Sequence, residues 1–124
     1  MMKILNKVLI IDDDPDVRTV MNVLMKKNGF EVETASRRED ALEKLNRFHP
    51  SVILLDVLLS GYDGRDLCKE IKSSERLKNI PVIMFSAHPG ASENFSSYGA
   101  DAFITKPVNT DALISEVRKL TKAS

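Results

Sequence analysis

Four short apolar runs divide the chain. They cover residues 8–11, 52–55, 81–85 and 102–104, and each is too short to form the core of a helix. Continuous apolar runs suit strands that are covered on both faces, which is typical of a parallel sheet between layers of helices. A fifth segment, residues 30–34, alternates apolar and charged side chains and predicts an edge strand with one protected face.

Segments with helical spacing lie between these runs. In the first, Asp14 is a good N-cap residue and Pro15 suits the first helical position, so the local sequence assigns Asp14 a structural role. Asn28 and Gly29 end this helix. Its predicted apolar face consists of Val17, Val20, Met21, Leu24 and Met25.

The other segments differ in how clearly their sequences predict a helix. Residues 36–39 match a capping box, which predicts a helix that begins there and buries residues 41, 45 and 48. Leu67 and Ile71 mark a third helix, whereas the Pro, Gly, Asn and Ser residues of 89–98 predict only a short or irregular one. A stripe over residues 113–120 predicts the last helix, with Asn109 or Thr110 as its cap.

Strand and helix thus alternate five times, which predicts a doubly wound α/β fold. The 124 residues suit a single domain over residues 1–124, with an expected structured core of about 6–122. Hydrophobic residues make up 43% and charged residues 29%, which excludes a disordered chain. The balance of 18 basic and 18 acidic residues argues against direct binding to nucleic acid or to an anionic membrane.

The cysteine content and the N-terminal sequence bear on localisation. The single cysteine, Cys68, cannot form an internal disulfide. We find no signal peptide and no apolar run of about 18 residues. The expected compartment is therefore the cytoplasm.

Polar side chains stand at the end of each apolar run. Asp12, Asp13 and Asp14 follow the first run, Asp56 follows the second, Ser86 follows the third, and Lys106 lies shortly after the last. Each could be a turn residue if taken alone. In a parallel sheet, however, all carboxyl ends lie at one edge, so the acids, the hydroxyl and the ammonium are predicted to converge.

The charges of such a cluster indicate its chemistry. Two carboxylates about 4 Å apart repel each other by roughly 4 kcal/mol at an effective dielectric constant near 20. The cluster must therefore take up a proton or hold a cation, and oxygen ligands with room for phosphate suit Mg²⁺. Our hypothesis from the residues is a Mg²⁺-assisted phosphoryl site in which Asp56 is the nucleophile.

The order of these motifs resembles the receiver domain of response regulators, the CheY-like phosphoacceptor module of two-component signalling. The resemblance covers essentially the whole chain and includes Gly64, eight residues after Asp56. The motifs that carry it are Asp12-Asp13, Asp56, Gly64, Ser86-Ala87, Gly99-Ala100-Asp101-Ala102-Phe103 and Lys106-Pro107. It implies a flavodoxin-like sheet of five parallel strands in the order 2-1-3-4-5.

The resemblance also implies roles for these residues. Asp56 takes a phosphoryl group from a histidine kinase, a phosphotransfer protein or a small phosphodonor, and Lys106 and Ser86 contact the phosphoryl oxygens. Ser86 and Phe103 switch conformation, and the Lys106–Pro107 bond is cis. The implied Mg²⁺ ligands are Asp12, Asp13, Asp56 and the backbone carbonyl of Leu58.

As a receiver, the chain is a signalling domain rather than an enzyme that turns over a substrate, and it acts on a downstream protein target. The sequence leaves open whether the chain forms a homodimer. It also leaves open whether the chain is a stand-alone protein or a fragment of a larger regulator or hybrid kinase.

Several positions depart from the family pattern. Ser60-Gly61 stands where a proline is common, which predicts a less rigid loop after Asp56. Pro89-Gly90 stands where a helix would begin, and Phe103 lacks the hydroxyl of the more frequent tyrosine. His88 lies where the family tunes the lifetime of the phosphate, and its structural alternative is an exposed loop histidine.

Two other functions compete with the receiver interpretation. A binding module with this fold could work without phosphorylation. A phosphatase of the haloacid-dehalogenase type also uses strand-end aspartates, and Asp12-Asp13-Asp14 superficially fits its motif, but Pro15-Asp16 replaces the small or β-branched residue expected there. The phosphate-binding motif of nucleotide hydrolases is absent.

Overall fold

One parallel sheet organises the fold. The computed structural model describes residues 6–59, 61–88, 90–91, 93–106 and 109–122. The sheet has the order β2-β1-β3-β6-β7 with all neighbours parallel. Its strands are β1 (Lys7–Ile11), β2 (Glu31–Ala35), β3 (Val52–Asp56), β6 (Val82–Ser86) and β7 (Ala102–Thr105). Because β4 and β5 belong to a separate hairpin, this is the predicted 2-1-3-4-5 order, and the predicted fold class is confirmed.

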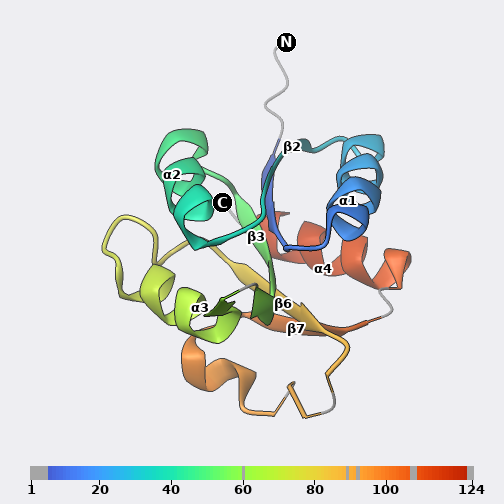
Figure 1. Ribbon diagram of the computed structural model, residues 1–124. Coiled ribbons are helices and arrows are strands. Elements are labelled where there is room, and N and C mark those ends of the chain that lie inside the picture. Colours follow the sequence, from blue (N-terminus) through green and yellow to red (C-terminus); the bar gives the residue numbers. More distant parts are fainter. Residues whose placement is uncertain (1–5, 60, 89, 92, 107–108, 123–124) are drawn as a thin grey trace.

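Helices cover both faces of the sheet (Figure 1). On one face lie α1 (Pro15–Lys27) and α4 (Thr110–Lys122), and on the other lie α2 (Arg38–Phe48) and α3 (Gly64–Ser73). Strand β1 shows how the two cores arise from a period of two: Val8 and Ile10 face α1 and α4, whereas Leu9 and Ile11 face α2 and α3. The continuous apolar runs are thus strands buried on both sides.

The helix ends follow their capping residues. Asp14 Oδ1 accepts a hydrogen bond of 2.9 Å from the backbone N–H of Asp16, which confirms the predicted N-cap of α1. Asn109 Oδ1 accepts one of 2.9 Å from Ala112 N–H, so Asn109 is the cap of α4 rather than Thr110.

Two predictions about the helices are wrong. Val20 is 63% exposed, because α1 contacts the core through Met21 and Met25, with Val17 and Leu24 partly buried beside them, and Val20 lies outside this stripe. Helix α2 begins at Arg38, with Arg37 as an N-cap that makes no side-chain bond, so Ser36 does not start a capping box. The first turn carries two acidic residues instead, which stabilise it through the helix dipole.

The segment between β6 and β7 is nearly free of helix among its described residues. Only the 3₁₀-helix η1 (Phe95–Tyr98) forms there, which confirms the predicted short helix. Asn94 before it and Gly99 after it both have left-handed backbone angles, with φ of 56° and 93°, so neither can extend the turn. No helix among the described residues has the length and apolar character to cross a bilayer.

A small antiparallel hairpin follows Asp56 and was not predicted. It consists of β4 (Leu58–Leu59) and β5 (Tyr62–Asp63). Gly64 closes it, because its N–H donates a hydrogen bond of 2.7 Å to the carbonyl of Val57. A Cβ atom at Gly64 would lie 2.0 Å from the carbonyl oxygen of Asp56, so only glycine fits where α3 begins against the end of β3.

This close approach predicts that Gly64→Ala lowers the free energy of unfolding by about 3 kcal/mol, since the backbone of β3 cannot yield as a flexible side chain can. Urea unfolding followed by circular dichroism measures the loss. Gly61→Ala is the matched control: its added Cβ meets nothing within 4 Å, and its φ of +71° adds only the strain of a left-handed residue, about 1 kcal/mol. Equal losses in the two variants would contradict the steric explanation.

Candidate functional site

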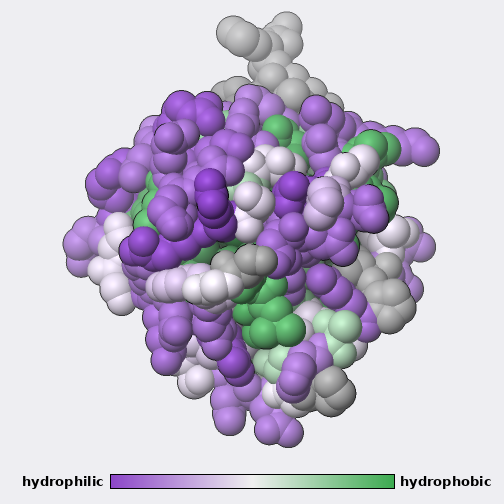
Figure 2. All heavy atoms as spheres, viewed as in Figure 1, coloured by the Kyte–Doolittle hydropathy of each residue, from purple (hydrophilic) through white to green (hydrophobic). Residues whose placement is uncertain are grey.

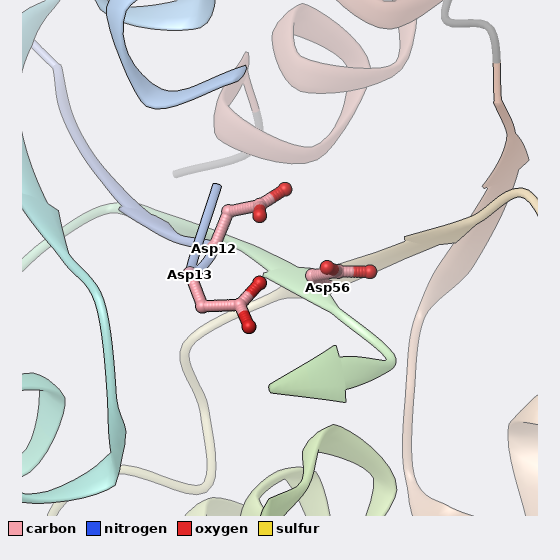
Figure 3. Close-up of side chains that lie close together, drawn as sticks. All are labelled: Asp12, Asp13 and Asp56. Carbon is pink, nitrogen blue, oxygen red and sulfur yellow. The ribbon is translucent and has the colours of Figure 1, made fainter. Parts of the chain in front are cut away.

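Three carboxylates meet at the carboxyl edge of the sheet. Asp12 and Asp13 follow β1 and Asp56 ends the neighbouring strand β3, so the parallel register brings them together. One oxygen from each of the three lies within 4.8 Å of the others, and Figure 3 shows the side chains around one space. Asp12 is fully buried, Asp56 is 5% exposed and Asp13 is half-buried. The predicted convergence of these residues is observed.

Lys106 reaches the same cluster from the end of β7. Its Nζ lies 3.3 Å from Asp12 Oδ2 and 3.6 Å from Asp56 Oδ2. Its backbone N–H donates a hydrogen bond of 2.9 Å to the carbonyl of Ser86, which holds the ends of β7 and β6 together. One ammonium group thus lies within 4 Å of two of the three clustered carboxylates.

The burial and crowding of these carboxylates change the pKa of Asp56. The pKa of its carboxyl group is raised from 3.8 to about 6: burial is the largest cause, the neighbouring carboxylate of Asp12 adds to it, and Lys106 opposes both effects. A cation bound among the oxygens would favour the ionised form. Because neutral pH lies above this pKa, Asp56 is mostly a carboxylate there, although burial and Asp12 disfavour its charge.

The backbone fixes Asp12 at the centre of the cluster. Asp12 Oδ1 accepts a hydrogen bond of 2.9 Å from the N–H of Asp14, while its carbonyl accepts one of 2.7 Å from Arg18 Nη1. Its own N–H donates to the carbonyl of Ala35 at 3.1 Å. Sequence analysis missed Arg18, because an arginine in the first turns of a helix carries no local sign that it points back to the preceding strand.

Ser86 and Phe103 lie on the strands beyond Asp56. Ser86 is buried and its Oγ accepts a hydrogen bond of 3.0 Å from the N–H of His88. Phe103 is half-buried, and its ring centroid lies 6.2 Å from that of Phe95 in η1. The ring therefore packs under η1 on the side of the sheet that carries α2 and α3.

The remaining predicted residues lie around the rim. His88 is exposed and lines a small cavity of about 180 Å³ that Leu58 also lines. The Leu58 side chain is 55% exposed, and its backbone N–H lies 3.4 Å from Asp56 Oδ1. The space-filling view shows a hydrophobic patch over the region of β4 within a mostly hydrophilic face (Figure 2). The predicted cis Lys106–Pro107 bond lies outside the described residues.

The donor set indicates which metal the cluster can hold. All of its ligand atoms are carboxylate oxygens, with no histidine or cysteine among them. Oxygen-only sets suit hard divalent cations, whereas zinc sites usually include histidine nitrogen or cysteine sulfur ligands. The three aspartates can therefore hold a hard metal ion.

Comparisons with known proteins agree with this site. The family model for the response regulator receiver domain matches residues 8–118. Protein PilG of Pseudomonas aeruginosa is 34% identical over 114 residues, which are 90% of this chain and 84% of PilG. The residues matched by the family model include Asp12, Asp13, Asp56 and Lys106.

Solved structures give the same result. The receiver domain of NtrX from Brucella abortus superposes with a TM-score of 0.87 at 31% identity, over 94% of this chain and 99% of that one. Chemotaxis protein CheY4 of Vibrio cholerae superposes with a TM-score of 0.87 at 26% identity, again over 94% and 99% of the two chains. The chain therefore belongs to the response regulator receiver domain family, the phosphoacceptor module of two-component signalling.

Proposed function

We propose that Asp56 is the phosphoacceptor of this receiver domain and that Mg²⁺ is its cofactor. The observation that carries the proposal is the position of Asp56, which is nearly buried, shares a metal-sized cluster with Asp12 and Asp13, and lies 3.6 Å from Lys106 Nζ. Asp12, Asp13, Asp56 and the carbonyl of Leu58 would hold the ion. Bound there, Mg²⁺ would supply positive charge to the oxygens of the transferred group.

The chemistry is a transfer between two nucleophiles. An Asp56 carboxylate oxygen attacks the phosphorus of a phosphohistidine, the O–P bond forms as the P–N bond breaks, and the departing imidazole takes up a proton. The product is an aspartyl phosphate. The donor is a histidine kinase or phosphotransfer protein, and a small acyl phosphate could replace it because the protein supplies the nucleophile and the charge.

Lys106 and Ser86 act on the product. The ammonium of Lys106 already lies within 4 Å of Asp56 and would pair with the new phosphoryl oxygens. The Ser86 hydroxyl would donate to one of them, and Phe103 would change its packing against Phe95 as the end of β6 moves. A hydrogen bond to a charged group contributes about 1.5–3 kcal/mol, which shifts a two-state equilibrium by roughly tenfold to a hundredfold.

The alternative is a binding module that keeps the fold and does not accept phosphate. Titration with beryllofluoride, a phosphoryl mimic, followed by NMR separates the two. A receiver shows saturable Mg²⁺-dependent shifts around Asp56, whereas the alternative shows none. The haloacid-dehalogenase interpretation requires turnover of a generic phosphate ester, which this proposal does not expect.

Asp56→Asn should abolish stable phosphorylation, because an amide oxygen is a poor nucleophile and gives no acyl phosphate. Transfer of labelled phosphate from acetyl phosphate measures this. Asp14→Asn is the control, since it changes an acid of the same segment that serves as an N-cap, and asparagine caps equally well. Retention of label by the Asp56 variant at the wild-type level would show that Asp56 is not the phosphoacceptor.

The raised pKa of Asp56 predicts how stability depends on pH without metal. Between about pH 4 and pH 6 the folded protein keeps a proton that the unfolded chain has released, so the free energy of unfolding falls as the pH rises, by up to about 3 kcal/mol. Asp56→Asn should lack this fall and be more stable than wild type near neutral pH in EDTA. Urea unfolding at the two pH values measures it, and identical pH profiles would contradict the cause given for the shift.

Lys106→Ala should separate phosphorylation from the conformational change, because it removes the cation that links Asp56 to the end of β7. In NMR spectra, beryllofluoride should still perturb residues next to Asp56, while the wild-type shifts at Phe103 and Phe95 are lost. Lys119→Ala, at an exposed position of α4, should behave like wild type. Full shifts at Phe103 in the Lys106 variant would refute the role.

A further inference from the structure

The β4–β5 hairpin cannot hold its position through its own hydrogen bonds. Each strand has two residues, paired as Leu58 with Asp63 and Leu59 with Tyr62, and two-stranded ribbons of this size are not stable alone. Its base is fixed where Gly64 N–H meets the carbonyl of Val57. Gly61 adds backbone freedom at the turn. Other contacts must therefore set the position of its far end.

Besides the side chain of Leu59, which is buried in the core, these contacts include a triad of side chains that the proposed chemistry does not use. The Tyr62 hydroxyl donates a hydrogen bond of 3.3 Å to Glu70 Oε1 in α3. Arg38, the first residue of α2, binds the same carboxylate in a bidentate ion pair: Nε donates to Oε1 at 2.9 Å and Nη2 donates to Oε2 at 2.6 Å. The guanidinium carbon also lies 5.5 Å from the centre of the Tyr62 ring.

The geometry of the triad sets it apart from an ordinary surface ion pair. A two-pronged arginine–carboxylate contact fixes direction as well as distance, and the aromatic face adds a third contact. Arg38 and Glu70 are each only about one third exposed, at 36% and 35% of their side chains, and the half-buried Tyr62 also packs against the core. Three elements, α2, α3 and β5, thus meet at one point.

We propose that Arg38, Glu70 and Tyr62 form a positioning triad that fixes the β4–β5 hairpin and, through it, the backbone of Leu58, whose N–H lies 3.4 Å from Asp56 Oδ1. Because Gly61 gives the turn backbone freedom, the triad supplies by side-chain contacts a rigidity that the turn itself does not provide. Arg38 does not touch the reacting atoms. It holds Glu70, Glu70 holds Tyr62, and Tyr62 holds the strand paired with β4.

The functional half of this inference rests on the proposed Mg²⁺ site. Two variants interrupt the triad without touching the metal ligands: Tyr62→Phe removes one hydroxyl, and Glu70→Met removes the shared acceptor. Each should raise the Kd for Mg²⁺, measured by NMR titration with MgCl₂, by about threefold to tenfold, the value of one hydrogen bond. Glu75→Gln is the matched control, because it removes the exposed pair with Lys78 that does not contact the hairpin.

The double variant separates a positioning role from general destabilisation. If both residues act through one hydrogen bond, Tyr62→Phe adds nothing in the Glu70→Met background. Additive losses in Kd, or Kd values equal to wild type in both single variants, would overturn the proposal.

Amide hydrogen exchange at residues 58, 59, 62 and 63, measured without Mg²⁺, tests the hairpin independently. Faster exchange there in the variants, with residues of β1 unchanged, supports the triad. Unchanged exchange overturns it. Failure of the wild-type protein to bind Mg²⁺ would instead refute the proposed function, and the exchange data would then decide the inference alone.

Discussion

The chemistry of the site depends on one constraint: the parallel sheet brings several carboxylates together at one edge, where they repel one another. Asp12 follows β1 and Asp56 ends the neighbouring strand β3, and both side chains are buried. Lys106 arrives from β7 and offsets part of the charge, but burial and the carboxylate of Asp12 still raise the pKa of Asp56. A bound cation would pair with the carboxylates, and a phosphoryl group would pair with the ammonium of Lys106.

The surrounding backbone keeps this unfavourable cluster in place. The N–H of Asp14 binds the Asp12 carboxylate, and the Arg18 guanidinium binds the Asp12 carbonyl. Gly64 lets α3 start directly against the end of β3, a contact that any side chain would break. The site is therefore costly to maintain but rigid, as expected of a centre that must meet an incoming phosphoryl group in one geometry.

The sheet and its site could be predicted from sequence because their signals are local. Runs such as 52–55 are apolar throughout because both faces of the strand are covered, and the polar residue that follows each run marks the sheet edge. Other features depend on distant partners. Val20 is exposed because α1 buries a narrower stripe than its spacing suggests, and the bond between Arg38 and Glu70 spans 32 positions with no motif to announce it.

The central claim is that Asp12, Asp13, Asp56 and the Leu58 carbonyl surround one divalent cation. Paramagnetic broadening by substoichiometric Mn²⁺ tests this most directly, because the effect falls steeply with distance from the ion and requires no phosphorylation. If the ion binds there, the amide signals of residues 12, 13 and 56–58 disappear first, and excess Mg²⁺ restores them. Broadening centred elsewhere, or spread evenly over the acidic surface, would contradict it.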